Sequence, residues 1–193
     1  TRRRFGNVIQ MYVPLYLSNF CSNQCVYCGF NCSNKIHRVV LNEDEIRREA
    51  EAIRRKYKFQ HILLVTGESP AKASVEYMGR AIEIMKEYFS QVSLEVQPLE
   101  ADEYRYLMDR GLHAVYVYQE TYNEARYPVY HLKGKKRNFR YRLETPDRLG
   151  EAGMYKIGLG NLIGLEDWRT EAFFMSLHLR YLLTQHWQSK YRF

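Results

Sequence analysis

Five short apolar runs recur along this chain, and each is followed by a stretch whose apolar residues are spaced as on one face of a helix. Continuous apolar runs of this length are typical of strands that are buried on both faces, as in parallel sheets. Strands that alternate with helices build α/β folds. The pattern therefore predicts a parallel α/β architecture of the barrel type. The predicted strands cover residues 13–18, 62–65, 93–97, 114–118 and 155–159.

Caps and apolar stripes mark the expected helices. Asn42 followed by Glu45 has the pattern of a capping box, so a helix is expected to begin after Asn42. Its apolar stripe consists of Ile46, Ala50, Ile53 and Tyr57. The other expected helices cover roughly 71–89, 101–110, 141–152 and 167–187. The last helix is expected to bury Phe173, Phe174, Leu177, Leu182 and Leu183.

The number of strand–helix units is small for a closed barrel, which takes eight strands and typically about 250 residues. Five units in 193 residues leave the barrel open at the first and fifth strands. The final residues, 187–193, show no obvious cap. We therefore expect one domain over residues 1–193, a partial barrel from a longer protein that also has three more strands and a leader.

The composition, with 46% hydrophobic and 26% charged residues, describes one ordinary globular domain. No stretch reaches the length of a membrane span, and no signal peptide is visible, so no membrane partner is expected and a reducing cytoplasmic location is the default. The net charge is +7, with basic residues densest in 133–142 and in 1–4. No RNA-binding motif accompanies them, which favours a solvated surface or a carboxylate-bearing ligand over nucleic acid.

Three cysteines follow the first apolar run in the spacing C-x3-C-x2-C: Cys21, Cys25 and Cys28. Iron–sulfur clusters are normally held by four Cys thiolates. Three thiolates would leave one iron of a [4Fe–4S] cluster open, which is what the cluster needs to bind S-adenosylmethionine (SAM) and pass it an electron. A zinc knot that adds Cys32 or His37 is the main alternative, and a disulfide is a weaker one. Cys32 is expected to be a bystander, because a fourth thiolate would close the open iron.

Polar and glycine-rich segments follow the other predicted strands, where the active sites of such barrels gather. They are 66–68, 97–98, 119–122 and 158–164. A glycine turn with a carboxylate could receive an ammonium group, and glycines let the backbone approach a flat ring closely. Each segment alone is most simply a turn or a solvated charge, but five polar strand ends at one mouth are hard to assign to chance.

The motifs resemble those of the radical SAM superfamily, and within it of the 2-iminoacetate synthases, the tyrosine lyases of bacterial thiamine biosynthesis. The resemblance spans essentially the whole chain. The segments that carry it are 14–19, 21–30, 65–68, 95–99, 118–122, 131–136, 142–148 and 156–160.

The resemblance implies a [4Fe–4S] cluster on Cys21, Cys25 and Cys28, with SAM as the second cofactor. It also implies contacts to SAM from several other residues. These are Thr66, Gly67 and Glu68 at the methionyl ammonium, Glu120 and Arg142 elsewhere on SAM, and Tyr27, Gly160, Leu162 and Gly164 near the adenine. Asp167 stands where many relatives have an acidic residue, although that motif is only approximate.

The implied reaction is a radical cleavage of the Cα–Cβ bond of L-tyrosine that gives 2-iminoacetate and p-cresol. It requires a strongly reducing partner such as flavodoxin, and the thiazole synthase is a second expected partner. No catalytic residue is assigned. Residues expected at the mouth, where they could touch the substrate, are Gln119, Tyr122, His131 and Lys133.

Two alternatives remain open. One is a sibling enzyme, either the tyrosine lyase of hydrogenase maturation, for which a second cysteine cluster beyond residue 193 is expected, or a tryptophan lyase. The other is a non-catalytic module that binds a metal or RNA.

Overall fold

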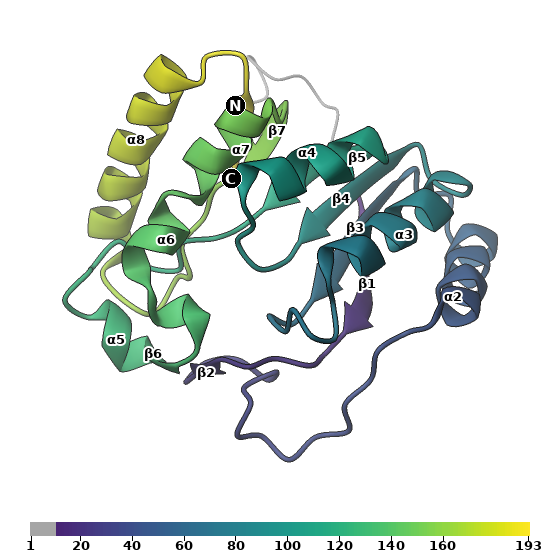
Figure 1. Ribbon diagram of the computed structural model, residues 1–193. Helices are drawn as coiled ribbons and strands as arrows, with labels where there is room; N and C mark the ends of the chain where they lie inside the picture. The colour runs from purple at the N-terminus through teal and green to yellow at the C-terminus, as the bar shows by residue number, and fades with distance from the viewer. Residues whose placement is uncertain (1–10) are drawn as a thin grey trace.

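The computed structural model describes residues 11–193, in which six parallel strands form one sheet (Figure 1). The basic cluster at 1–4 lies outside the described residues. Strands neighbour one another in chain order, as in a barrel that is opened along one side. The strands are β1 (Val13–Ser18), β3 (His61–Thr66), β4 (Gln91–Glu95), β5 (Leu112–Tyr116), β7 (Lys156–Gly158) and β8 (Lys190–Arg192). This arrangement confirms the predicted parallel α/β fold and its partial barrel.

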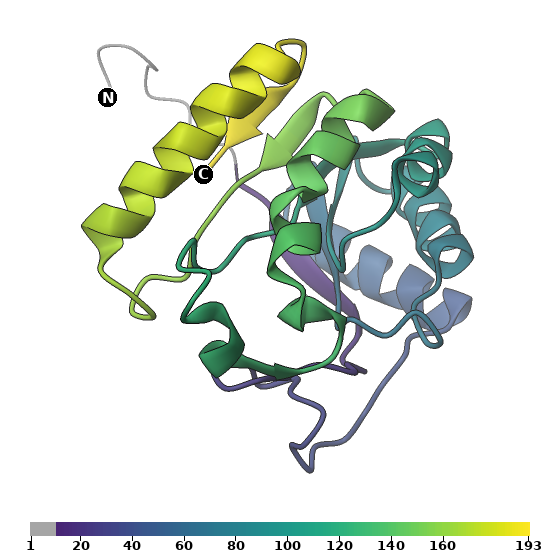
Figure 2. The same ribbon diagram turned by 60° about the vertical axis from the view of Figure 1, so that its left-hand side comes forward.

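Five helices form an outer layer along the sheet, and each packs against the next (Figure 2). They are α2 (Glu43–Lys56), α3 (Val75–Lys86), α4 (Ala101–Asp109), α7 (Thr145–Ala152) and α8 (Trp168–Gln185). Smaller elements lie at the carboxyl ends of the strands. They are β2 (Gln24–Cys25) and β6 (His131–Lys133), which pair antiparallel, with α5 (Tyr127–Tyr130), η1 (Lys135–Arg137) and α6 (Phe139–Leu143).

The predicted cap of α2 is confirmed. The Asn42 side chain accepts a hydrogen bond from the backbone N–H of Glu45 at 2.9 Å, and the Glu45 carboxylate accepts one from the N–H of Asn42 at 2.8 Å. Such caps stabilise a helix by about 1 kcal/mol. Helix α3 begins later than the predicted residue 71, because Ser74 caps it through the N–H of Tyr77.

The single helix predicted for 141–152 is wrong. The structure has two helices there, α6 and α7, with Glu144 between them. Pro146 lies in the first turn of α7, where its missing N–H costs nothing. The same proline cannot donate to the preceding turn, so the chain starts a new helix instead of extending α6.

The expectation of five strands is also wrong: the parallel sheet has a sixth strand, β8, at residues 190–192, and β2 and β6 form a separate pair. Strand β8 pairs parallel with β7, with Ile157 opposite Tyr191. Only Tyr191 is buried in β8. A strand of three residues is too short to show the alternation of apolar and polar residues by which strands are recognised in a sequence.

The sheet has two unlike faces. Residues that face the helices form the hydrophobic core, and they include Ile62, Leu64, Leu94, Val115 and Ile157. The alternate residues point to the opposite, concave side, where Leu63, Val65 and Glu95 line a cavity. Because successive side chains of a strand point to opposite faces, each strand contributes to both the core and the cavity.

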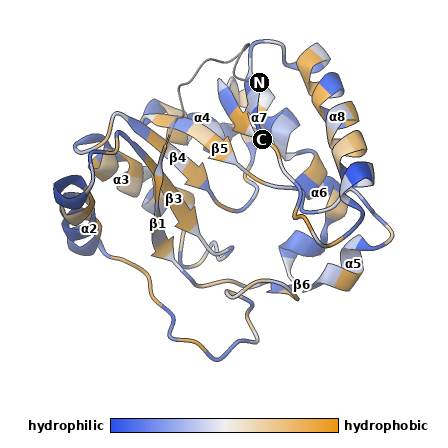
Figure 3. Ribbon diagram, turned by 180° about the vertical axis from the view of Figure 1, so that it is seen from behind, coloured by the Kyte–Doolittle hydropathy of each residue, from blue (hydrophilic) through white to orange (hydrophobic). Residues whose placement is uncertain are grey.

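Helix α8 is less buried than its sequence predicts. Of the five apolar residues expected to be buried, only Leu182 is, whereas Phe173 is 60% exposed. Orange, hydrophobic segments recur along the helix in Figure 3. Within residues 11–193, no helix is both long enough and apolar enough to span a bilayer.

A candidate cofactor cavity at the carboxyl ends of the strands

A cavity of about 530 Å³ lies at the carboxyl ends of the strands, between the sheet and the cysteine loop. Residues from β1, β3, β4 and the segments after β3 and β5 line it together with the loop. Most of the predicted site residues meet there, and they are Cys21, Cys25, Tyr27, Cys28, Thr66, Gly67, Glu68, Glu120 and Arg142. Gln97, at the end of the third predicted strand, also lines the cavity.

The cysteines differ in exposure. Cys25, in β2, is buried, while Cys21, Cys28 and Cys32 are partly exposed, and all four are free thiols. Cys32 does not line the cavity. Its backbone N–H donates to the carbonyl of Asn23 at 2.9 Å, which folds the end of the loop back on its beginning.

Arg38 holds the cysteine loop closed at its base. Its guanidinium donates hydrogen bonds to the carbonyl oxygens of Asn19 at 2.6 Å, Phe30 at 2.9 Å and Asn31 at 2.7 Å, and to that of Asn34 at 3.2 Å. The first carbonyl precedes Cys21 and the others follow Cys28, so one side chain ties the two ends of the loop together. The rigid fork of Arg suits this task better than the point charge of Lys.

Gly67 is required by a close approach of the strand-end turn to the cysteine loop. A Cβ atom at this position would lie 2.2 Å from the carbonyl oxygen of Phe20. Two backbone hydrogen bonds join the segments, from Gly67 to Ser18 and from Ser22 to Glu68, both at 2.9 Å. The glycine turn therefore positions the cysteine loop and does not merely change the direction of the chain.

The Glu68 carboxylate is buried at the cavity wall and accepts a hydrogen bond from the side-chain amide of Asn23. The amide oxygen of Asn23 in turn accepts from the backbone N–H of Lys136 at 3.0 Å. Gly134 makes room for this amide, because a Cβ there would lie 2.0 Å from its oxygen. Asn23 thus joins the cysteine loop, the glycine turn and the basic segment.

Glu120 is the one non-glycine residue in residues 11–193 with a positive φ, at 71°. This conformation is uncommon for non-glycine residues and often marks a functional constraint. Its carboxylate lies 2.7 Å from Nζ of Lys136 and 3.7 Å from a guanidinium nitrogen of Arg142. Arg142 is itself held by a 2.6 Å hydrogen bond from Nε to the carbonyl of Tyr118. Sequence reasoning missed Lys136 as a site residue.

Carboxylates outnumber cations in the cavity. Glu68, Glu95 and Glu120 line it, opposite Lys136 and Arg142. Burial raises the pKa of Glu95, and the nearby Glu120 carboxylate raises it further. The cavity therefore offers fixed negative charge for an ammonium or sulfonium group and buried cations for a carboxylate.

His131 lies behind the cavity wall. It is fully buried and does not line the cavity, so its predicted place at the mouth is wrong. Its Nδ1 lies 2.9 Å from the carbonyl oxygen of Tyr127, and its Nε2 lies 2.7 Å from the hydroxyl of Tyr27. A carbonyl only accepts, so Nδ1 carries a proton. Burial lowers the pKa of His131 to about 4, which leaves Nε2 to accept from Tyr27.

The other residues predicted at the mouth also lie elsewhere. Gln119 is buried outside the cavity, and its side-chain amide has no hydrogen-bond partner among the described residues. Tyr122 bonds to His178 of α8 at 3.1 Å. The side chain of Lys133 is exposed on β6.

Of the residues predicted near the adenine, Tyr27 lines the cavity, whereas Gly160, Leu162 and Gly164 do not. The carbonyl of Gly160 accepts from the N–H of Gln119 at 3.0 Å, and the N–H of Leu162 donates to Glu120 at 2.7 Å. These bonds place the segment beside the cavity and support the backbone of Glu120. Asp167 has a structural role as the N-cap of α8, where it accepts from the N–H of Thr170 at 3.0 Å.

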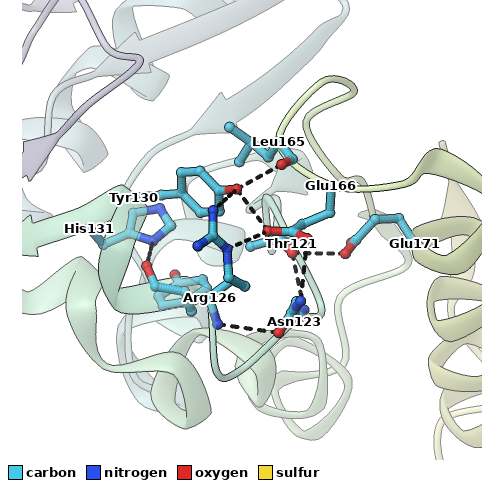
Figure 4. Close-up of polar contacts among 9 residues, drawn as sticks. Thr121, Asn123, Arg126, Tyr130, His131, Leu165, Glu166 and Glu171 are labelled. Carbon is cyan, nitrogen blue, oxygen red and sulfur yellow. Dashed lines mark hydrogen bonds and ion pairs between the residues drawn. The ribbon is translucent and has the colours of Figure 1, made fainter.

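The buried Glu171 fastens α8 to the segment after β5, and the partly exposed Glu166, just before α8, contacts α5, as Figure 4 shows. Glu171 of α8 accepts hydrogen bonds from Thr121 and from the N–H of Tyr122, both at 2.8 Å. Glu166 accepts from the Tyr130 hydroxyl at 2.7 Å. Sequence reasoning missed both glutamates, although together they fix the segment that carries Glu120.

The donor set fits an iron–sulfur cluster. Burial raises the pKa of the Cys25 thiol to about 11, and Lys136 opposes that rise. A bound metal deprotonates a coordinating thiol outright. Among the described residues, no three His, Cys, Asp or Glu side chains are arranged around a single ion. A cubane takes one thiolate per iron, so its three cysteines need not share one centre.

Comparisons with known proteins identify the family. The model of the radical SAM superfamily matches residues 15–176. The 2-iminoacetate synthase of Escherichia coli (strain K12) is 55% identical over 99% of this chain and 51% of its own length. The chain thus spans about half the length of the curated relatives it matches.

Solved structures give the same fold. The FeFe-hydrogenase maturase HydG from Carboxydothermus hydrogenoformans matches with a TM-score of 0.91 and 35% identity, over 95% of this chain and 43% of that one. Methylornithine synthase (PylB) matches with a TM-score of 0.77 at 24% identity, over 95% of this chain and 53% of that one, which supports the fold alone. With a family model that covers most of its length, this chain belongs to the radical SAM superfamily.

Proposed function

We propose that this chain is the cofactor-binding part of a 2-iminoacetate synthase, a carbon–carbon lyase that cleaves L-tyrosine between Cα and Cβ to give 2-iminoacetate and p-cresol. The observation that carries this proposal is the 55% identity to a 2-iminoacetate synthase over 99% of the chain. A cytoplasmic location and a contact with the thiazole synthase remain predictions from the sequence.

Cys21, Cys25 and Cys28 would hold the [4Fe–4S] cluster, and the rest of the cavity would take SAM. When bound, the two cofactors supply one-electron cleavage of the sulfonium, which starts hydrogen abstraction from the amino group of the substrate. The protein supplies binding and orientation. A reducing partner such as flavodoxin has to provide the electron.

The charged residues of the cavity would orient SAM at its polar end. Glu68, held by Asn23, would receive the methionyl ammonium together with the backbone of the glycine turn. Arg142 would receive the carboxylate, because a buried guanidinium makes strong charge-assisted hydrogen bonds. Glu120 lies between Lys136 and Arg142, so its carboxylate keeps both cations in place before SAM arrives.

Anaerobic reconstitution with iron and sulfide tests the cofactor assignment, with electron paramagnetic resonance (EPR) before and after SAM is added. A [4Fe–4S] signal that changes with SAM is expected. The alternative of a non-catalytic metal or RNA module predicts bound zinc and no 5′-deoxyadenosine after addition of dithionite and SAM.

A second candidate function comes from the likeness to HydG, at TM-scores of 0.91 and 0.92. Product analysis with L-tyrosine and L-tryptophan separates the candidates. The full-length protein should form p-cresol with glyoxylate or glycine from tyrosine alone. Cleavage of tryptophan would point to a tryptophan lyase, and a second cysteine cluster beyond residue 193 would favour a hydrogenase maturase.

A further inference from the structure

An exposed patch, here called the β6 surface, lies beside the cysteine loop. It combines apolar and basic side chains. Val26, Val129 and Leu132 are 54%, 48% and 45% exposed. The basic members, which are also exposed, are Lys133, Lys135 and Arg137.

Backbone pairing places the β6 surface against the predicted cluster ligands. In the pairing of β2 with β6, Gln24 lies opposite Lys133 and Cys25 lies opposite His131. The N–H of Val26 donates to the carbonyl of Tyr130 at 3.0 Å. Figure 1 draws β2, β6 and α5 together at one edge of the molecule. Val26 is also the residue that follows Cys25, so the apolar part of the surface begins within the loop itself.

The charge of this region is not balanced locally. No Asp or Glu occurs in residues 1–42, which contain the cysteine loop, or in residues 125–143. Lys136 and Arg142 are used inside the cavity, where they meet Glu120. The side chains of Lys133, Lys135 and Arg137 form no ion pair or hydrogen bond among residues 11–193. They therefore leave a positive field over the outer side of the loop.

We propose that the β6 surface docks an acidic, low-potential electron-carrier protein, such as a flavodoxin, which reduces the cluster through the outer side of the cysteine loop. This inference rests on the proposed function. One electron passes from the reduced carrier to the oxidised cluster, so the carrier is oxidised by one electron and no bond forms. A small apolar centre with charged neighbours suits the small, transient interfaces of redox partners, where charge complementarity mainly raises the association rate.

The aromatic residues of this region argue against nucleic acid as the partner. Proteins that bind single strands stack bases on free aromatic rings. Here Tyr127 is fully buried, Tyr130 is bound to Glu166, and Tyr141 donates to Glu100 at 2.7 Å. The uncharged side chains of the β6 surface, Val26, Val129 and Leu132, are aliphatic instead.

The test compares two charge reversals in the full-length protein. The double variant K135E/R137E alters the β6 surface, and K56E/K58E changes exposed lysines at and beyond the end of α2 by the same net charge. Binding of oxidised flavodoxin is measured at low and moderate salt, and SAM cleavage is measured with reduced flavodoxin and with dithionite. A third variant, Leu132→Ser, probes the apolar centre.

K135E/R137E should weaken flavodoxin binding and flavodoxin-driven cleavage about tenfold or more, with less effect as salt rises. Leu132→Ser should weaken binding at every salt concentration. Dithionite-driven cleavage should stay within about twofold for all variants. Equal flavodoxin binding and equal flavodoxin-driven cleavage in K135E/R137E and K56E/K58E would overturn the proposal. So would a short RNA that binds the β6 surface when changes to this surface leave flavodoxin binding unaltered. If the wild type cleaves no SAM with dithionite, the proposed function fails. The binding measurements would still test whether the β6 surface binds flavodoxin.

Discussion

The hydroxyl of Tyr27 lies 2.7 Å from Nε2 of His131, a residue 104 positions away in the chain. One residue comes from the cysteine loop and the other from β6. The opposite nitrogen of the imidazole is fixed by the carbonyl of Tyr127 at 2.9 Å. The hydrogen bond therefore joins a ring on the cavity wall to a buried histidine behind it. Tyr27 itself lies between two predicted cluster ligands, Cys25 and Cys28, in the sequence.

Removing both partners of this pair should destabilise the protein less than the two single removals added together. Tyr27→Phe leaves a buried imidazole nitrogen unpaired, and His131→Leu leaves the tyrosine hydroxyl unpaired, each at a cost of about 1–3 kcal/mol. The double variant should cost less than the sum of the two single variants, because no unpaired group remains. Urea unfolding of the cluster-free protein measures all three. Strict additivity would show that the hydrogen bond contributes nothing.

Gly67→Ala should disturb the cysteine loop. The new Cβ would meet the Phe20 carbonyl oxygen at 2.2 Å, and neither backbone can move without breaking the hydrogen bonds that join them. Overpacking of this kind costs about 1–3 kcal/mol or more. Iron bound per chain after reconstitution should fall together with stability. Gly29→Ala is the matched control, because a Cβ at Gly29 meets nothing within 4 Å. Equal iron contents for the two variants would contradict the role given to Gly67.

Arg38→Lys should weaken cluster binding while the fold persists. An ammonium cannot reach the carbonyls of Asn19, Phe30 and Asn31 together, so the loop loses its closure. Changes to residues that orient metal ligands typically weaken metal binding about 10- to 100-fold. Cluster retention under a chelator, followed by visible absorbance, measures the effect. Arg48→Lys, at an exposed position of α2, should behave as the wild type. Free guanidinium should partly restore retention in Arg38→Gly, which a merely unfolded variant would not show.

The strands and the α2 cap could be read from the sequence because their signals are local. A buried parallel strand such as β3 is a continuous apolar run, and the capping box of Asn42 and Glu45 lies within four residues. The break between α6 and α7 and the strand β8 were missed. The first depends on one proline in an otherwise helical pattern, and the second is only three residues long.

The location of the site could be predicted from the sequence, but the contacts that hold its residues in position could not. Parallel strand ends meet at one edge, which brought residues 66–68 and Glu120 to the cysteine loop. Contacts such as those of Arg38 and Asn23 join residues far apart in sequence, and no period or spacing marks them. One feature of the sequence pointed to the role of Arg38. No Asp or Glu occurs before residue 43, so carbonyl oxygens were the main acceptors near its guanidinium along the chain.

Stability should fall on mild acidification because of His61. Its Nε2 lies 2.6 Å from the buried hydroxyl of Ser93. Its pKa is lowered from 6.5 to about 4, mainly by burial and in smaller part by the neighbouring Lys156 and His113. The unfolded chain binds a proton below about pH 6.5, whereas the folded chain does so only near pH 4. Stability is therefore complete above pH 6.5 and is lost as the pH falls toward 4.

At pH 5 His61 should reduce the free energy of unfolding by roughly 2 kcal/mol. This pH lies about 1.5 units below the ordinary pKa of 6.5, and each unit corresponds to about 1.4 kcal/mol. Urea unfolding at pH 7.5 and pH 5 measures it, with His61→Gln as the comparison that lacks the titrating group. The wild type should lose more stability than His61→Gln between the two pH values. Equal losses would mean that His61 does not carry this pH dependence.

Cys25→Ala should abolish SAM cleavage, whereas Cys32→Ala should leave it nearly unchanged. Cys25 is buried at the cavity in the strand that pairs with β6, and Cys32 lies outside the cavity. A cluster that keeps one iron open uses three protein thiolates, so loss of Cys25 removes a required ligand and loss of Cys32 removes none. Iron content, EPR and 5′-deoxyadenosine release are measured on both reconstituted proteins. Loss of activity in Cys32→Ala at normal stability would indicate a fourth thiolate ligand, and an iron closed by protein could not bind SAM.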